Sequence, residues 1–291
     1  MPATAQPRSA NSSWCGLAVV AVALLLLLPF VRKPFHLDDT VFVRIGQKIL
    51  EQPLEPYNFV YCWNAAFQSM WLQTMHPPLY SYLLAAVGSI AGFSETAMHV
   101  AGLFFAGGCV WLMHRLATRF CEFPATATLV AVVTPGFLVS STTVMADIPL
   151  LFFWLLAVQE TVRAVDTEHL GRLWLAGLAA AAAVMTKYFG IALIPLLLVY
   201  WHVASRKIDM GGRISVDALA LWLPVLVLIG WAGYSYEELG QFHPLAAVSY
   251  AGSERGLTVI LGDLWRTIPY FGATILWPCA LLMKARRLAR R

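Results

Sequence analysis

Long uninterrupted apolar runs alternate along this chain with short polar connections. A helix needs roughly 17–25 mostly apolar residues to cross a bilayer. Closed β-barrels alternate apolar and polar residues, which these continuous runs do not. We therefore predict an all-α, polytopic membrane protein in one membrane-embedded domain, residues 1–291, without a soluble domain. The predicted spans, about eight, are residues 14–31, 96–114, 124–142, 147–163, 172–188, 189–204, 217–235 and 267–283.

A shorter apolar segment, residues 77–92, begins with two prolines and is either a span or a helix in the outer interface. Basic residues favour the cytoplasmic side of a membrane. With the amino terminus inside and 77–92 outside, every inner loop is basic, as is the tail KARRLARR. We therefore predict that both termini are cytoplasmic. The outer segments are then about 32–95, 140–146 and 236–266.

Composition supports a membrane protein. The chain is 59% hydrophobic and 12% charged, with a mean hydropathy of +0.67. A soluble domain of 291 residues could not bury so much apolar surface. Nucleic acid is not an expected partner, because no folded basic surface accompanies the basic tail. The five cysteines show no CxxC spacing, so neither a metal centre nor redox chemistry is expected from them.

The first outer segment contains an expected amphipathic helix from the acidic pair Asp38-Asp39 to about Leu50. Its apolar positions share one stripe, and its polar positions lie away from that stripe. This pattern predicts a helix lying on the outer face of the bilayer. The apolar stripe is Val41, Phe42, Ile45 and Ile49, and the polar positions are Arg44, Gln47 and Lys48.

Asp38, Asp39 and Asp147 are candidate catalytic residues, because a carboxylate at a membrane boundary is costly to keep. A carboxylate at a partly dry boundary can take a proton from a hydroxyl. Two adjacent carboxylates can also share the work, one as the base and the other orienting it or holding a cation. The competing interpretation is helix capping, which fits Asp147 well because it precedes Ile148-Pro149.

Four basic residues are candidate ligands for a donor phosphate: Lys187, Arg44, Arg32 and Lys33. Lys187 ends an apolar run on the outer side and could neutralise a phosphate leaving group, or merely extend to the interface. The other three are basic residues on the outer side, against the usual bias. They either bind an anionic group or anchor the segment to lipid headgroups.

His76, Tyr80 and Tyr188 are candidate substrate-binding residues. His76 precedes a double proline, which fixes an extended entry into the next helix. Its ring could donate to an anion or a sugar hydroxyl, or simply be solvated. The surrounding aromatic residues read as an interfacial belt, with sugar stacking as the alternative. This set comprises Tyr57, Phe59, Tyr61, Trp63, Phe67 and Trp71.

Four motifs in this order resemble the C-type glycosyltransferase superfamily, and most closely the branch of protein O-mannosyltransferases and lipid A aminoarabinose transferases. The motifs are FHLDD (35–39), HPPLYSYLLA (76–85), VMADIPL (144–150) and GLAAAAAVMTKYFGIALIPLLL (177–198). The family usually has more spans than this chain and often a following soluble domain.

The resemblance implies an enzyme that uses a polyprenyl-phosphate sugar and works on the periplasmic or lumenal face. It implies that Asp38 is the base and that Asp147 is the second acidic position. Lys187 and the basic residues of the first outer segment would hold the lipid phosphate. Transfer would invert the sugar carbon without an organic cofactor; some branches place a divalent cation between the acidic motifs, which is not expected here.

The expected partners are the polyprenyl-phosphate sugar, membrane lipid and an acceptor that is a lipid, a glycan or a protein. The expected location is a bacterial inner membrane, with the active site facing the periplasm. Two other functions remain open at this point: a transporter or flippase of a lipid-linked sugar, and a short non-catalytic subunit. Transporters place ionisable groups near the bilayer midplane, so acids at one boundary favour the enzyme.

Overall fold

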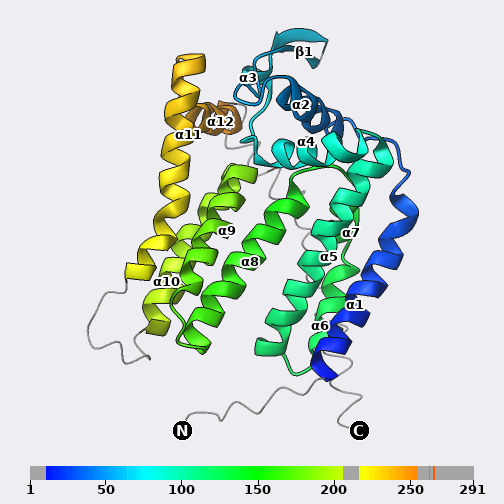
Figure 1. The fold of residues 1–291 in the computed structure, drawn as a ribbon, viewed down its shortest axis with the longest axis vertical. Helices are drawn as coiled ribbons and strands as arrows, with labels where there is room; N and C mark the ends of the chain where they lie inside the picture. Colours follow the sequence, from blue (N-terminus) through cyan, green and yellow to red (C-terminus); the bar gives the residue numbers. More distant parts are fainter. Residues whose placement is uncertain (1–10, 64, 206–215, 254–261, 263–264, 266–291) are drawn as a thin grey trace.

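Helices of different lengths, several of them long enough to cross a membrane, run side by side in one bundle (Figure 1). The structure, a computed structural model, describes residues 11–63, 65–205, 216–253, 262 and 265. The bundle consists of α1 (Asn11–Leu27), α5 (Glu95–Phe120), α6 (Pro124–Val132), α7 (Pro135–Ser141), α8 (Asp147–Asp166), α9 (Arg172–Thr186), α10 (Leu193–Ser205) and α11 (Leu223–Leu239). Short 3-10 turns complete it: η1 (Leu28–Phe30), η2 (Tyr188–Ala192) and η3 (Val216–Trp222).

The helical membrane fold is confirmed. Within the described residues, four segments are long and apolar enough to span a membrane: Ser13–Phe30, Glu95–Phe120, Asp147–Asp166 and Asp217–Leu239. The bent pair α6–α7 would make a fifth. Two of the predicted spans, 172–188 and 189–204, correspond to shorter apolar helices. The eighth predicted span, 267–283, lies outside the described residues.

The predicted span 124–142 is broken rather than straight. Its two halves, α6 and α7, meet at an angle of 64°. Thr134 caps α7, accepting a hydrogen bond from the Phe137 backbone N–H at 3.4 Å. Pro135 follows at the first position of α7, where its missing N–H costs nothing. A proline inside one continuous helix would leave a carbonyl unpaired, so the chain starts a new helix instead.

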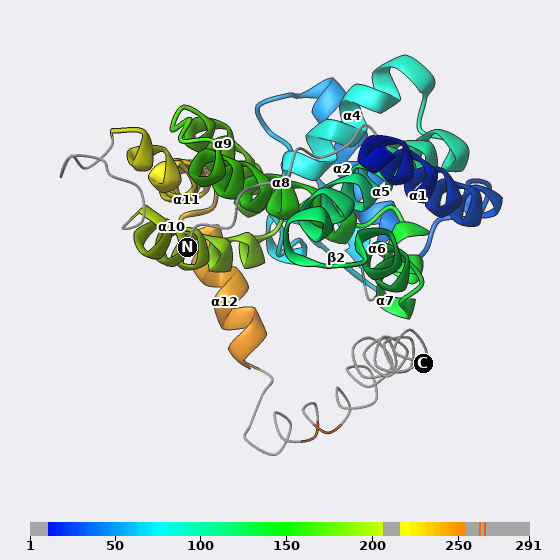
Figure 2. The ribbon, with the colours of Figure 1, turned by 90° about the horizontal axis from the view of Figure 1, so that it is seen from below.

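Helix α8 lies between α9 on one side and α5 on the other, as the view from below shows (Figure 2). One apolar core joins α8 to α9, α10 and η3, and it is rich in alanine along α9. A second joins α8 to α1, α5, α6 and α7. Small side chains let α9 approach its neighbours closely. A methyl group on Gly177 would come within 2.0 Å of the Ala220 carbonyl oxygen.

The other elements form a cap over one end of the bundle, at the top of Figure 1. They are α2 (Asp39–Glu51), the antiparallel hairpin β1 (Val60–Trp63) and β2 (Ala66–Ser69), α3 (Met70–Gln73), α4 (Leu79–Ala91) and α12 (His243–Ser253). The ambiguous segment 77–92 is therefore α4, which packs against α2 across the bundle end, in accord with the outer-interface interpretation. The hairpin was not predicted from the sequence.

The amphipathic helix exists as α2, but protein rather than lipid covers much of its apolar face. Phe42 and Val43 pack against α4, α5 and the segment 144–146. Ile45 and Ile49 pack against the region after the hairpin and against α11. The amphipathic helix of the first outer segment is thus present, and its apolar stripe contacts protein where lipid contact was expected. The periodicity shows that one face avoids water, and here the remainder of the cap supplies the cover.

Candidate functional site

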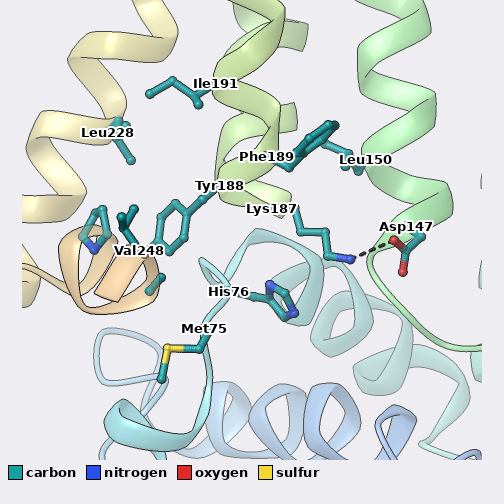
Figure 3. Close-up of a pocket in the computed structure, with 12 residues that line it drawn as sticks. Met75, His76, Asp147, Leu150, Lys187, Tyr188, Phe189, Ile191, Leu228 and Val248 are labelled. Carbon is teal, nitrogen blue, oxygen red and sulfur yellow. Dashed lines mark hydrogen bonds and ion pairs between the residues drawn. The ribbon is translucent and has the colours of Figure 1, made fainter. Parts of the chain in front are cut away.

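Asp147 and Lys187 form an ion pair at the cap end of the bundle. Asp147 begins α8, and Lys187 directly follows α9, which packs alongside α8. Neighbouring antiparallel helices bring the start of one next to the end of the other. The Lys187 Nζ donates to Asp147 Oδ1 at 2.8 Å (Figure 3). The side chains are 21% and 42% exposed respectively, so the lysine is the more buried partner.

A tight turn after α9 directs the Lys187 side chain toward Asp147. The backbone leaves the helix at Lys187 with φ −152° and ψ 134° and enters η2 at once. The Gly190 N–H donates to the Lys187 carbonyl at 2.8 Å. A methyl group on Gly190 would come within 2.6 Å of the backbone of Ala183 and Val184. Glycine is therefore required where the chain folds back on the end of α9.

A cavity of about 670 Å³ surrounds the ion pair. His76 contributes a further polar group, Tyr188 contributes its ring, and most of the wall is apolar (Figure 3). The apolar wall includes Met75, Leu150, Phe189, Ile191, Leu228 and Val248. A mostly apolar cavity whose wall carries the ammonium group of Lys187 suits a ligand that joins an anionic group to a hydrocarbon chain.

A second cavity of about 290 Å³ adjoins the first and contains Asp38. Met75 and His76 line both cavities and so form the wall between them. Trp63 and Gln73 add an aromatic ring and an amide to the second cavity. The Gln73 amide nitrogen donates to the backbone of β1 and β2, which leaves its buried oxygen unpartnered. The two cavities together could hold two molecules that meet beside His76.

His76 is held firmly from several sides. Its ring stacks on Phe42 with centroids 5.6 Å apart. Its carbonyl accepts a hydrogen bond from the Tyr57 hydroxyl at 2.7 Å, and its N–H donates to Thr74 Oγ1 at 3.4 Å. Burial, together with the charge of Lys187, lowers the pKa of His76 to about 4. His76 is therefore neutral near pH 7 and meets a ligand as an uncharged imidazole.

The low pKa of His76 predicts a pH-dependent loss of stability. In the unfolded chain the imidazole has a pKa near 6.5, so below about pH 6.5 the unfolded state binds more protons. The contribution of His76 is full above that pH and falls away toward pH 4, by at most about 3 kcal/mol. Melting temperatures of the detergent-purified protein should drop over this window, and less steeply in His76→Gln.

Part of that slope should remain in the variant, because burial also lowers the pKa of His243. The comparison therefore concerns the difference between the two profiles rather than either melting temperature alone. Parallel profiles for the natural chain and His76→Gln would contradict the assignment of a neutral, buried His76.

The adjacent carboxylates Asp38 and Asp39 have different environments. Asp39 is fully buried, and its two oxygens accept hydrogen bonds from the backbone N–H groups of His36 at 2.8 Å and Val144 at 2.9 Å. Asp39 thus ties the start of α2 to the segment that precedes Asp147. Asp38 makes no capping bond. Among the described residues no ion pair or hydrogen bond engages its carboxylate, which lines the second cavity.

His243, which the sequence analysis did not single out, closes the site from the other side. Its Nε2 lies 2.9 Å from the Thr74 carbonyl and must donate to it, so its Nδ1 accepts from the Tyr188 hydroxyl. That hydroxyl accepts in turn from the Trp231 indole at 2.7 Å. The Tyr188 hydroxyl is thereby fully engaged inside the protein. Only its ring faces the first cavity, which limits it to apolar contact with a substrate.

The predicted aromatic belt is partly a buried cluster. Tyr57 and Trp71 are almost fully buried and pack against Trp231 and His243. Phe67, by contrast, is 79% exposed on the hairpin. A repeated His-Pro dipeptide, His243-Pro244 after His76-Pro77, is the signal in the sequence that could have indicated His243.

Four other predicted site residues lie away from both cavities. Arg44 is exposed and donates to Gln47 on its own helix. Lys33 donates to the Thr142 carbonyl at 3.2 Å, and Arg32 is exposed. Tyr80 is buried beneath Phe42, with ring centroids 5.5 Å apart. Of the four predicted phosphate ligands, the structure brings Lys187 to the cavity wall.

No group of three or more His, Cys, Asp or Glu side chains converges on a possible metal position in the described part of the chain.

Comparison with known proteins places this fold in context. A family profile described as dolichyl-phosphate-mannose-protein mannosyltransferase matches residues 75–231, more than half of the 291 residues. A comparison with curated proteins found no significant match.

Two solved structures are similar in fold. One is the Saccharomyces cerevisiae protein O-mannosyltransferase Pmt1–Pmt2 complex bound to the sugar donor, with a TM-score of 0.57 and 16% identity over 81% of this chain and 34% of that one. The other is ArnT from Cupriavidus metallidurans bound to undecaprenyl phosphate, with a TM-score of 0.57 and 19% identity over 80% of this chain and 43% of that one. This chain thus matches less than half the length of either protein.

Proposed function

The chain belongs to the dolichyl-phosphate-mannose-protein mannosyltransferase family, within the C-type glycosyltransferases, and we propose that it transfers a sugar from a polyprenyl-phosphate donor to an acceptor hydroxyl. The similar structures carry a sugar donor and undecaprenyl phosphate respectively, which supports this donor class. Because the chain matches only part of their length, we do not infer its acceptor from theirs.

The observation that carries the proposal is the Lys187 ammonium group in a mostly apolar cavity, next to Asp147 and His76. Lys187 Nζ lies at the wall of the 670 Å³ cavity, and Asp147 holds it at 2.8 Å. A polyprenyl phosphate joins a phosphate to a long hydrocarbon chain, and this cavity offers a partner to each part. The phosphate of the donor gains negative charge as its bond to the sugar breaks. A preorganised ammonium group stabilises that charge more strongly in a dry site than in water.

Asp38 is the proposed base in the adjoining cavity. The acceptor hydroxyl occupies the space beside Asp38 and loses its proton to the carboxylate while its oxygen attacks the anomeric carbon. The bond between that carbon and the phosphate oxygen breaks, and the electron pair leaves with the phosphate. Direct displacement of this kind inverts the configuration, and one base suffices. His76, at the wall shared by the two cavities, contacts the sugar during transfer.

The proposed location is the bacterial inner membrane with the site facing the periplasm. The chain is an integral membrane protein. Its site lies at the cap end of the bundle, whereas Arg115, Arg119, Arg163 and Arg172 lie toward the opposite end. Basic residues favour the cytoplasmic side, so the cap faces outward.

Transfer of labelled sugar from several polyprenyl-phosphate sugars, hexoses and pentoses, tests this function in membranes that contain the chain. We expect donor-dependent labelling of membrane lipid, glycan or protein, above that of matched membranes without the chain. A correctly inserted chain that transfers from none of the donors, and does not bind undecaprenyl or dolichyl phosphate, would refute the proposal.

A further inference from the structure

One face of the β1–β2 hairpin is turned toward the start of α2, and the other face is exposed. Tyr61 and Trp63 are two residues apart on β1 and therefore share a face. The Tyr61 hydroxyl lies 3.2 Å from Thr40 Oγ1 on α2, and the Tyr61 and Trp63 rings stack with centroids 6.5 Å apart. Phe67 belongs to the exposed face. The hairpin thus presents Trp63 to the second cavity, which also contains Asp38.

Gln73, at the end of α3, is bound to the hairpin through one end of its side-chain amide. Its Nε2 donates to the carbonyls of Tyr61 and Gln68. Because both partners are carbonyls, this end must be the nitrogen, and the orientation of the amide is fixed. The oxygen, Oε1, is buried and has no hydrogen-bond partner among the described residues. Gln73 lines the second cavity, so a ligand hydroxyl that donated to Oε1 would remove the free-energy cost of an unpaired acceptor.

The second cavity differs in charge from the first. The first carries the Lys187 ammonium group, whereas no lysine or arginine is among the described residues that line the second. The second cavity offers two oxygen acceptors beside the neutral ring of His76, on Asp38 and on Gln73. An anionic acceptor molecule would face the Asp38 carboxylate without a compensating cation, which like charges disfavour. The cavity therefore suits an uncharged ligand that brings hydrogen-bond donors.

Size and shape narrow this ligand to a sugar ring. The volume of about 290 Å³ is at the lower end of the usual range for ligand pockets, roughly 300–1,000 Å³. One sugar residue brings several hydroxyl donors for Asp38 and Gln73, and its C–H face can pack on the electron-rich face of an indole such as that of Trp63. A serine or threonine side chain brings a single hydroxyl and no ring.

Building on the transfer reaction proposed above, we propose that its acceptor is an uncharged sugar residue. The ring of this residue packs on Trp63, and one of its hydroxyls donates to Gln73 Oε1. A second hydroxyl loses its proton to Asp38 as its oxygen bonds to the anomeric carbon, and the electron pair of the broken bond leaves with the lipid phosphate. The headgroup of a glycolipid and a free glycan both offer this chemistry. Trp63 and Gln73 thus determine specificity for the acceptor, whereas Lys187 serves the donor.

The bond that holds the transferred label tests this inference in the same membranes that test transfer. We expect the label to be joined to another sugar by a glycosidic bond, which withstands both alkaline β-elimination and mild acid. Release by β-elimination would place the label on serine or threonine, and release by mild acid would place it on a phosphate. Either release would overturn the inference while transfer itself stood. Organic extraction separates a glycolipid acceptor from a free glycan. Absence of labelling from every donor would instead refute the transfer reaction, and this inference with it.

Trp63→Leu, assayed with the isolated acceptor, is expected to raise the acceptor KM roughly 10-fold, because an aromatic contact is lost. The donor KM should stay unchanged. A smaller folded fraction would lower kcat and leave both KM values as they are, so this readout separates recognition from stability. Phe67→Leu is the matched control, because Phe67 is an aromatic residue of the same hairpin that is 79% exposed and does not line the cavity. Equal effects of the two variants would contradict the placement of the sugar on Trp63.

Monodeoxy analogues of the acceptor sugar test Gln73. With the natural chain, the analogue that lacks the hydroxyl bonded to Oε1 should have a KM roughly 10-fold above that of the parent sugar. In Gln73→Met this difference should vanish, because neither sugar then has an acceptor for that hydroxyl. The ratio within each variant is unaffected by any loosening of the hairpin, two carbonyls of which lose their donor. An unchanged ratio in Gln73→Met would rule out the role assigned to Gln73.

Discussion

Asp38→Asn is expected to lower the rate of sugar transfer by roughly 10²–10⁴-fold, the usual contribution of a general base. The amide keeps the size of the carboxylate but takes no proton from the acceptor hydroxyl. Because Asp38 makes no capping bond and lines the second cavity, the change should leave the fold intact. Single-turnover transfer with bound donor measures the effect, and donor affinity should stay close to that of the natural chain.

Asp39→Asn is the matched control, one position along the same helix. Both Asp39 oxygens accept hydrogen bonds from backbone N–H groups. In the asparagine variant, the side-chain NH2 would lie against one of these N–H donors, which would lose its acceptor. Leaving a buried donor unsatisfied costs about 1–3 kcal/mol, and the melting temperature should fall. Full transfer activity in Asp38→Asn, or an inactive but fully stable Asp39→Asn, would reverse the roles assigned to the pair.

Lys187→Gln is expected to lower kcat/KM by roughly 10²–10³-fold, as removal of a preorganised charge partner does. The glutamine cannot neutralise the phosphate that leaves. Asp147 then loses its partner, but its side chain is 42% exposed and remains solvated, so global unfolding is not expected. Steady-state transfer at several donor concentrations measures the effect, and Lys187→Arg should retain part of the activity because it keeps the charge.

Lys33→Gln is the matched control for Lys187→Gln. Lys33 is also a lysine at the cap end, but it bonds to the Thr142 carbonyl and does not line the cavities described above. Its loss should change transfer little. If Lys33→Gln were as damaging as Lys187→Gln, the phosphate would be held by a wider basic surface than the cavity alone.

Sequence patterns predicted which faces of the helices avoid water better than they predicted whether protein or lipid covers those faces. The stripe of α2 was read correctly from its spacing, and Phe42, Ile45 and Ile49 are buried. Its cover could not be read, because lipid and protein select the same apolar side chains. The α6–α7 break lay within one apolar run, where hydropathy is continuous and Pro135 alone marked the change of direction.

In the candidate site, too, the sequence predicted the general location of the residues better than the directions of their side chains. Motif order placed Asp38, Asp147 and Lys187 at one membrane face, and the structure also brings them to one end of the bundle. The family resemblance singled out Asp38, but the residues themselves did not show which carboxylate of the Asp38-Asp39 pair faces the cavity, because neighbouring residues on a helix point about 100° apart. That distinction depends on how α2 packs against residue Val144, more than 100 positions later.

The walls of the candidate site come from distant parts of the chain, and this governs when the site exists during synthesis. His76 emerges from the ribosome early, whereas His243 and Val248 follow after α11. The Thr74 carbonyl meets its partner on His243 only then. A nascent chain that has inserted α1 to α10 therefore has Asp147 and Lys187 but lacks the wall of the first cavity that α11 and α12 supply. A ligand that needs every wall of this cavity is therefore expected to bind only after α11 and α12 have been synthesised.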